Sequence, residues 1–153
     1  QKELYDLPNI ETIDWIDTLS EQFRQIATES VAIILPSASE LSCGSVIAGM
    51  MTGLIPVTTP SSDIDVKAIG FSIEDDSVDA IRSAVCAVRD HPVSGLADMS
   101  RASWEAARQR YGRDKFLHAY REAICGILNL RQPDEWVQSV GEIRVPEIKI
   151  CTI

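Results

Sequence analysis

The stretch VAIILPSASELSCGSVIAGMMTGLIPVTT, residues 31–59, decides the fold. Residues 31–35 form an unbroken apolar run that ends at Pro36, which predicts a central parallel strand buried on both faces. A polar loop then leads to a helix expected over residues 42–52, with Gly53 in the position of a left-handed C-cap. Residues 55–59 predict the next strand. A strand, a polar loop, a helix and a second strand in this order indicate an α/β domain with a mainly parallel sheet.

The residues on either side extend the same alternation of strand and helix. A short strand is expected at residues 10–16, and Ser20 is a good N-cap for a helix from Glu21 to about residue 28. Residues 60–65 read as a polar loop, residues 70–73 as a further strand, and Asp76 as the N-cap of a helix. That helix has an apolar stripe formed by Val78, Ile81, Val85 and Val88. Further helices are expected over residues 95–110 and 114–130.

Composition and charge narrow the class of protein. The chain has 153 residues, of which 45% are hydrophobic and 24% charged, as in an ordinary globular domain. A formal net charge of -9 argues against nucleic acid as the main partner. The four cysteines form no CxxC pair and only two histidines occur, so a metal site or a disulfide framework is not expected. Free thiols fit a reducing cytosol, and we expect a cytoplasmic protein without a membrane span or signal peptide.

The first turn of the helix after residue 35 is the best candidate for chemistry. Ligands of open parallel sheets bind outside the carboxyl ends of the strands. Residues 42–45 are small, so a phosphate could approach their backbone N–H groups at the positive end of the helix dipole. Glu40 could accept hydrogen bonds from sugar hydroxyls. Every doubly wound domain has such turns, however, and on these residues alone a solvated Glu40 in an ordinary turn is the simpler interpretation.

Several motifs in order resemble those of the group 1 glycosyltransferases. Residues 36–40, PSASE, followed by Gly44 resemble the family's PS-x-SE-G motif, and residues 48–57 resemble its EAMA-x-G-x-PV segment. The resemblance covers roughly residues 5–130. Weaker matches follow in family order at residues 7–15, 63–71, 75–81, 99–107 and 111–120.

The resemblance implies a retaining GT-B hexosyltransferase, in which two Rossmann-like domains face a cleft. This chain would be the Rossmann-like, three-layer donor domain, residues 1–130, N-terminally truncated and followed by a tail, residues 131–153. A separate N-terminal domain would hold the glycan or lipid acceptor and make any peripheral membrane contact, so this chain would be inactive alone. The family usually needs no metal or other cofactor.

Site residues follow from the same resemblance. Glu40 would be the catalytic residue that meets the hydroxyls of the donor sugar. The donor is a nucleoside-diphosphate sugar, and the remaining contacts would come from the helix start. Its sugar and diphosphate would lie against the backbone amides of Leu41, Ser42, Cys43 and Gly44, with Ser45 and Val46 near the phosphates.

One departure from the family pattern leaves other functions open. The family has a second glutamate eight residues after the first, which usually holds the ribose, and Ala48 stands there in this chain. A methyl group accepts no hydrogen bond, so a non-catalytic GT-B-like binding module is one alternative. An unrelated flavodoxin-like ligand-binding domain is another. Asp63 and Asp65 are either ligand contacts or turn residues, and Cys43 is expected to pack rather than to react.

Overall fold

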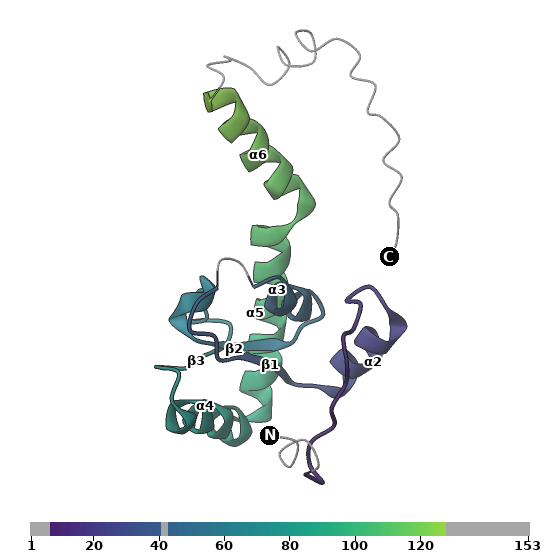
Figure 1. The fold of residues 1–153 in the computed structure, drawn as a ribbon, viewed down its shortest axis with the longest axis vertical. Coiled ribbons are helices and arrows are strands. Elements are labelled where there is room, and N and C mark those ends of the chain that lie inside the picture. The colour runs from purple at the N-terminus through teal and green to yellow at the C-terminus, as the bar shows by residue number, and fades with distance from the viewer. Residues whose placement is uncertain (1–6, 41–42, 128–153) are drawn as a thin grey trace. The chain divides into compact units, whose positions relative to one another are not determined.

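The computed structural model describes residues 7–40 and 43–127, and the chain divides into two compact units, Gln1–Tyr111 and Gly112–Ile153. The expected boundary after residue 130 and the tail beyond it lie outside the described residues. The first unit contains α2 (Glu21–Glu29), β1 (Ala32–Leu35), α3 (Gly44–Met51), β2 (Ile55–Thr58), the 3-10 turn η1 (Pro60–Ser62), β3 (Phe71–Ser72), α4 (Val78–Asp90) and α5 (Val93–Tyr111) (Figure 1). The second contains α6 (Arg113–Ile127).

The three strands form an open, parallel sheet in the order β1-β2-β3. The predicted α/β class with a parallel sheet is confirmed, and its topology is compatible with a Rossmann-like fold. β2 is the central strand, and all of its residues are buried. The prediction that residues 31–35 form the central strand is wrong: among the described residues β1 is an edge strand that pairs with β2 alone. The side chains of Val31 and Ile34 are exposed.

Proline occupies the central strand without leaving a buried donor unpaired. The N–H of Ile55 points toward β1, where it donates to the Val31 carbonyl at 3.1 Å. Because successive residues of a strand alternate, the nitrogen of Pro56 faces β3, and proline has no N–H to offer there. The ladder with β3 begins only one residue later, with Val57 opposite Phe71. Gly70 precedes that ladder and lies close against Pro56.

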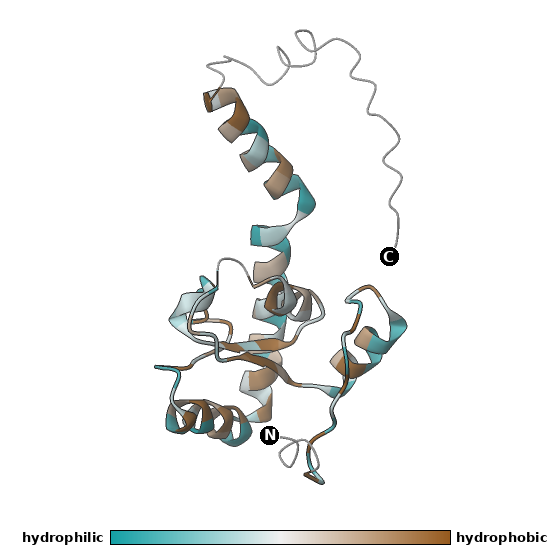
Figure 2. Cartoon of the chain, in the orientation of Figure 1, coloured by the Kyte–Doolittle hydropathy of each residue, from teal (hydrophilic) through white to brown (hydrophobic). Residues whose placement is uncertain are grey.

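Both faces of the sheet are covered by helices, which gives three layers. On one face, α3 and α5 enclose a core around Val46, Met50 and Ala107, with Ile33 and Leu35 of β1 beneath them. On the other face, α4 packs over a second cluster formed by Val57, Ile73 and Ala84. Figure 1 shows α3 and α4 on opposite sides of the strands, and the strands and α3 carry mostly hydrophobic residues in Figure 2.

The connection from α3 to β2 is fixed by backbone and side-chain hydrogen bonds. Gly53 has φ of 91°, as predicted for a left-handed C-cap residue. Its N–H donates to the Met50 carbonyl at 2.9 Å, and the N–H of Leu54 donates to the Gly49 carbonyl at 3.0 Å. The buried hydroxyl of Ser103 on α5 donates to the Leu54 carbonyl at 2.8 Å. These bonds fix the residues just before β2 relative to α3 and α5.

Three further expectations need correction. Residues 10–16 form no strand, and most of them are exposed, because an extended segment becomes a strand only when a neighbouring strand pairs with it. The N-cap of α4 is Ser77 rather than Asp76, since the Ser77 hydroxyl accepts from the N–H of Ala80 at 3.1 Å. The expected stripe of that helix is also rotated: Val78 and Val85 are exposed, and Ala84 is buried.

Candidate functional site

The first turn of α3 lies at the carboxyl end of β1, where parallel sheets bind ligands. The N-terminal helix caps in the chain differ in one respect. Serine hydroxyls cap α2 and α4, whereas no side chain among residues 7–40 and 43–127 caps α3, whose N-cap residue is Cys43. The first N–H groups of a helix have no partner within the helix. In α3 no side chain of the described residues occupies them.

The predicted donor-site residues divide into exposed and buried ones. Gly44 and Ser45 are exposed, and a Cβ added at Gly44 would meet nothing within 4 Å. Cys43 and Val46 are 4% and 1% exposed and belong to the core under α3, so only their backbone can meet a ligand. Glu40 is exposed at the end of the preceding loop. Leu41 and Ser42 lie outside the described residues.

Side chains from the next loop hold the segment that leads to Glu40. The carbonyl oxygen of Ser37 accepts hydrogen bonds from the hydroxyls of Thr59 and Ser61. These two hydroxyls also lie 2.8 Å from each other. The loop after β1 is thus tied to the loop after β2. This connection positions the PSASE motif relative to the sheet, and residue spacing alone does not predict it.

The position of the missing second glutamate is partly open to solvent. Ala48 lies on α3, one turn beyond Gly44, and is half-buried. No carboxylate stands there to bind a ribose. The other expectation for α3, that Cys43 packs rather than reacts, agrees with its burial; its Sγ lies 3.4 Å from the Ser45 hydroxyl.

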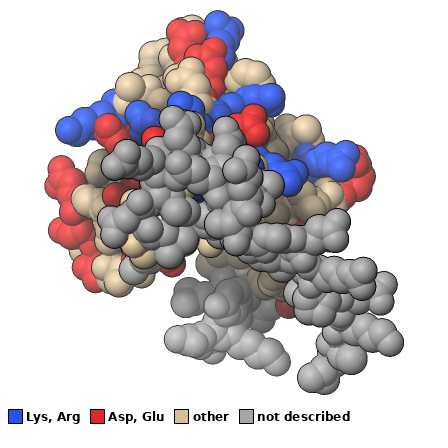
Figure 3. Space-filling model, turned by 90° about the horizontal axis from the view of Figure 1, so that it is seen from above, with Lys and Arg blue, Asp and Glu red and all other residues tan. Residues whose placement is uncertain are grey.

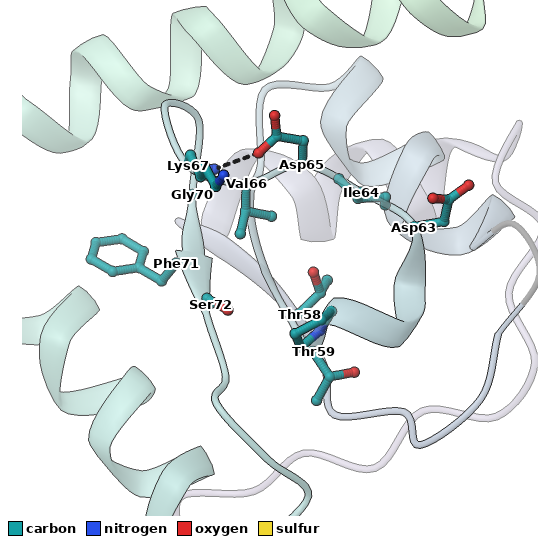
Figure 4. Close-up of a pocket in the computed structure, with 11 residues that line it drawn as sticks. Thr58, Thr59, Asp63, Ile64, Asp65, Val66, Lys67, Gly70, Phe71 and Ser72 are labelled. Atoms are coloured by element: carbon teal, nitrogen blue, oxygen red, sulfur yellow. Dashed lines mark hydrogen bonds between the residues drawn. The ribbon is translucent and has the colours of Figure 1, made fainter.

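A pocket with a volume of about 580 Å³ opens at the carboxyl end of β2 and beside β3 (Figure 4). It is lined by residues 58–60, 63–67 and 70–72. Asp63 and Asp65, for which the sequence left ligand contact and turn chemistry open, both line it. Asp63 also has the backbone of a turn, with φ of 57°. Thr58, Lys67 and Ser72 also line the pocket, and the sequence analysis does not predict them as site residues. Polar residues that lie next to the ends of strands are the pattern that would predict them.

One acid near the strand ends has a shifted pKa. Asp75 follows β3 and accepts a hydrogen bond from the N–H of Ser77 at 2.8 Å. Hydrogen bonds from the side chain and backbone of Ser77 hold the pKa of Asp75 below its ordinary value of 3.8.

Over the visible part of the face in Figure 3, acidic and basic side chains are intermingled. That pattern is typical of a solvated surface.

Comparison with known proteins adds no relative: no family model matches the chain, and no curated protein matches it. None of the helices within the described residues is long and apolar enough to cross a membrane. The fold and the local chemistry therefore carry the functional argument.

Proposed function

We propose that the chain is the nucleotide-sugar-binding half of a retaining, GT-B-type glycosyltransferase. The observation that carries the proposal is the first turn of α3 at the carboxyl end of β1, which no side chain of the described residues caps and which has open space at Gly44. A phosphate needs close access to backbone N–H groups, and a residue without a side chain gives it. The motif order around residues 36–57 supports the same assignment.

In the proposed reaction, the first turn of α3 stabilises negative charge. When the bond from the sugar to the diphosphate breaks, charge grows on the leaving phosphate oxygens. Free N–H groups at the start of α3 and the positive end of its dipole would stabilise that charge. Glu40, exposed just before the turn, would accept hydrogen bonds from the sugar hydroxyls and offset positive charge that develops on the sugar. The acceptor would come from a separate domain.

A second candidate function rests on Ala48. A hydrogen bond to a charged group contributes about 1.5–3 kcal/mol, and this chain lacks the glutamate that would make one to the ribose. A non-catalytic binding module that keeps the same fold accounts for that loss. The two candidates differ in what they predict for nucleotide binding.

The test is calorimetric titration of the chain with UDP, GDP and ADP. We expect one of them to bind, and Gly44→Val to abolish binding because the side chain would block approach to the turn. Gly126→Val is the matched control, since a Cβ at Gly126 also meets nothing within 4 Å. Glu40→Gln should weaken binding of the nucleotide sugar more than that of the free nucleotide. Absence of any response to all three nucleotides would refute the donor site.

A gain-of-function variant separates the two candidates. In an active donor site that has lost one contact, Ala48→Glu should tighten nucleotide binding by about tenfold or more, because it restores a charged hydrogen bond. Ala48 is only half-buried, so the longer side chain has access to solvent. Ala48→Gln controls for side-chain length without charge. An unchanged affinity in Ala48→Glu would favour the non-catalytic module.

A further inference from the structure

The helix α6 has an apolar side that is open to solvent, and none of its residues is buried. Four apolar residues recur along it at intervals of three or four, which places them on one side of the helix: Phe116, Tyr120, Ile124 and Ile127. The rings of Phe116 and Tyr120 stack, with their centroids 5.8 Å apart. Phe116, Tyr120 and Ile127 are 66%, 56% and 75% exposed. We call these four residues the apolar stripe.

The chain around the start of α6 is basic, although the protein as a whole is acidic. Residues 108–121 contain five of the 14 Lys and Arg residues and one acid, Asp114, whereas the whole chain has a formal net charge of -9. All five bases are exposed, and they take part in no ion pair among residues 7–40 and 43–127. They are Arg108, Arg110, Arg113, Lys115 and Arg121.

The second acid of α6 lies on the side away from the apolar stripe. Glu122 is two residues from the nearest members of the stripe, and two residues turn a helix by about 200°. Its carboxylate lies 3.3 Å from Nδ1 of His118 on the same side. Arg113, in contrast, is three residues before Phe116 and so lies beside the stripe. An anionic partner that contacts the stripe therefore meets Arg113 and does not meet Glu122.

An amphipathic helix with exposed aromatic residues and neighbouring bases is typical of a segment that lies on a membrane surface. The 15 residues of α6 span about 22 Å, less than the hydrocarbon thickness of about 30 Å, so the helix would lie along the surface. Nucleic acid would suit the bases but would leave Ile124 and Ile127 without an apolar partner. Two copies paired along the stripe would bury on the order of 500 Å² in total, less than the roughly 1,000 Å² of a stable interface.

We propose that α6 binds the surface of an anionic phospholipid bilayer. The apolar stripe would enter the acyl region, and the bases of residues 108–121 would contact the headgroups. The site goes beyond the proposed donor function and does not depend on it, because the stripe can meet a bilayer whether or not a nucleotide binds at α3. It would give this chain a membrane contact of its own, in addition to any that a separate acceptor domain makes.

The proposal is tested by flotation of the full chain with phosphatidylcholine vesicles that contain, or lack, phosphatidylglycerol as about a third of the lipid. We expect binding to the anionic vesicles, and binding to phosphatidylcholine alone at least about tenfold weaker, because each base near an anionic surface contributes about fivefold. Added salt should weaken binding to the anionic vesicles. A failed nucleotide titration would leave this expectation unchanged, so the two proposals can fail separately.

One variant checks the apolar contact. Phe116→Ser should weaken binding to the anionic vesicles by about tenfold or more, because a large apolar side chain no longer leaves water. Val78→Ser is the matched control, since Val78 is a 70% exposed apolar residue on another helix, α4. It should bind as the native chain does. Far-UV circular dichroism confirms that each variant keeps its helices.

A double variant checks the charge. Arg113→Gln combined with Lys115→Gln should weaken binding by about thirtyfold, at about fivefold for each base. Arg82→Gln combined with Arg89→Gln is the matched control, because it removes the same charge from exposed residues of α4. The control should bind within about threefold of the native chain.

The proposal is overturned if the chain does not float with anionic vesicles, if phosphatidylcholine alone binds it equally, or if Phe116→Ser binds as the native chain does. Sedimentation velocity and urea unfolding identify other occupants of the stripe. Without flotation, a dimer that Phe116→Ser dissociates would assign the stripe to a second copy. Without flotation, a loss of stability in Phe116→Ser would assign it to contacts within the chain. Either result overturns the membrane site.

Discussion

Replacing Gly70 by alanine should destabilise the sheet, because β3 approaches β2 too closely for a side chain. An added Cβ would overlap the Pro56 carbonyl oxygen and would lie 2.9 Å from Pro56 Cγ and 3.1 Å from its carbonyl carbon. Carbon atoms in ordinary contact are about 3.5–4.0 Å apart. Pro56 cannot retreat, since it lies fully buried in the central strand. The strain therefore falls on β3, which pairs through only two residues.

The expected cost is the sum of a steric and a hydrogen-bond contribution. Overpacking costs about 1–3 kcal/mol, and loss of the bond from the Ile73 N–H to the Thr58 carbonyl, 2.9 Å long, adds about 1 kcal/mol. The reduced entropy of the unfolded chain returns about 0.4–1 kcal/mol. The net loss is about 1–3.6 kcal/mol, or a fall in Tm of about 2–14 °C.

Urea denaturation followed by far-UV circular dichroism measures this loss. Gly44→Ala is the control, because a Cβ there meets nothing within 4 Å, and its stability should stay within about 0.5 kcal/mol of the native chain. If Gly70→Ala were as stable as Gly44→Ala, β3 would not approach Pro56 as closely as the structure has it. The reasoning about Pro56 in the central strand would then fail with it.

Three further outcomes follow from single hydrogen bonds. Ser103→Ala removes the donor to the buried Leu54 carbonyl and should cost about 1–3 kcal/mol in thermal or urea unfolding. Ser77→Ala removes the N-cap of α4 and should cost about 1 kcal/mol in the same assay. Because the folded pKa of Asp75 is depressed, its stabilising effect is present above the ordinary value of 3.8 and is lost as pH falls through the folded pKa. Carboxyl NMR should give a pKa below 3.8 for Asp75, and Ser77→Ala should move it back up; an unchanged pKa would contradict the assignment of the cause.

The sequence predicted those elements whose signals are local. Ser20 and Gly53 mark the start of α2 and the end of α3, because a hydroxyl cap and a positive φ depend only on the nearest turn of chain. The start of α4 differs from the prediction by one residue, because Asp76 and Ser77 are both good N-caps and it is the Ser77 hydroxyl that accepts from the N–H of Ala80.

The candidate site was predictable only in part for a similar reason. Glu40 and Gly44 stand out through a contiguous motif, but the bonds from Thr59 and Ser61 to the Ser37 carbonyl join residues more than twenty positions apart. The pocket likewise combines Thr58 with Ser72, which a parallel sheet brings to one edge. Such contacts between distant residues cannot be predicted from hydropathy and residue spacing unless the strand order is known.

The apolar run at residues 31–35 predicts a buried strand but does not predict the place of β1 in the sheet. An apolar run predicts that both faces of a strand are covered, and Ile33 and Leu35 are indeed packed against the core under α3. Whether both edges are also paired depends on a segment elsewhere, and β1 pairs only with β2 within the described residues. Ile34 points to the opposite face of the sheet, where α4 packs over Val57 and Ile73, and its side chain is exposed. β2 is the central strand although it contains a proline. The sheet tolerates Pro56 because the hydrogen-bonded pairing with β3 begins one residue later, at Val57, so no N–H is needed from Pro56.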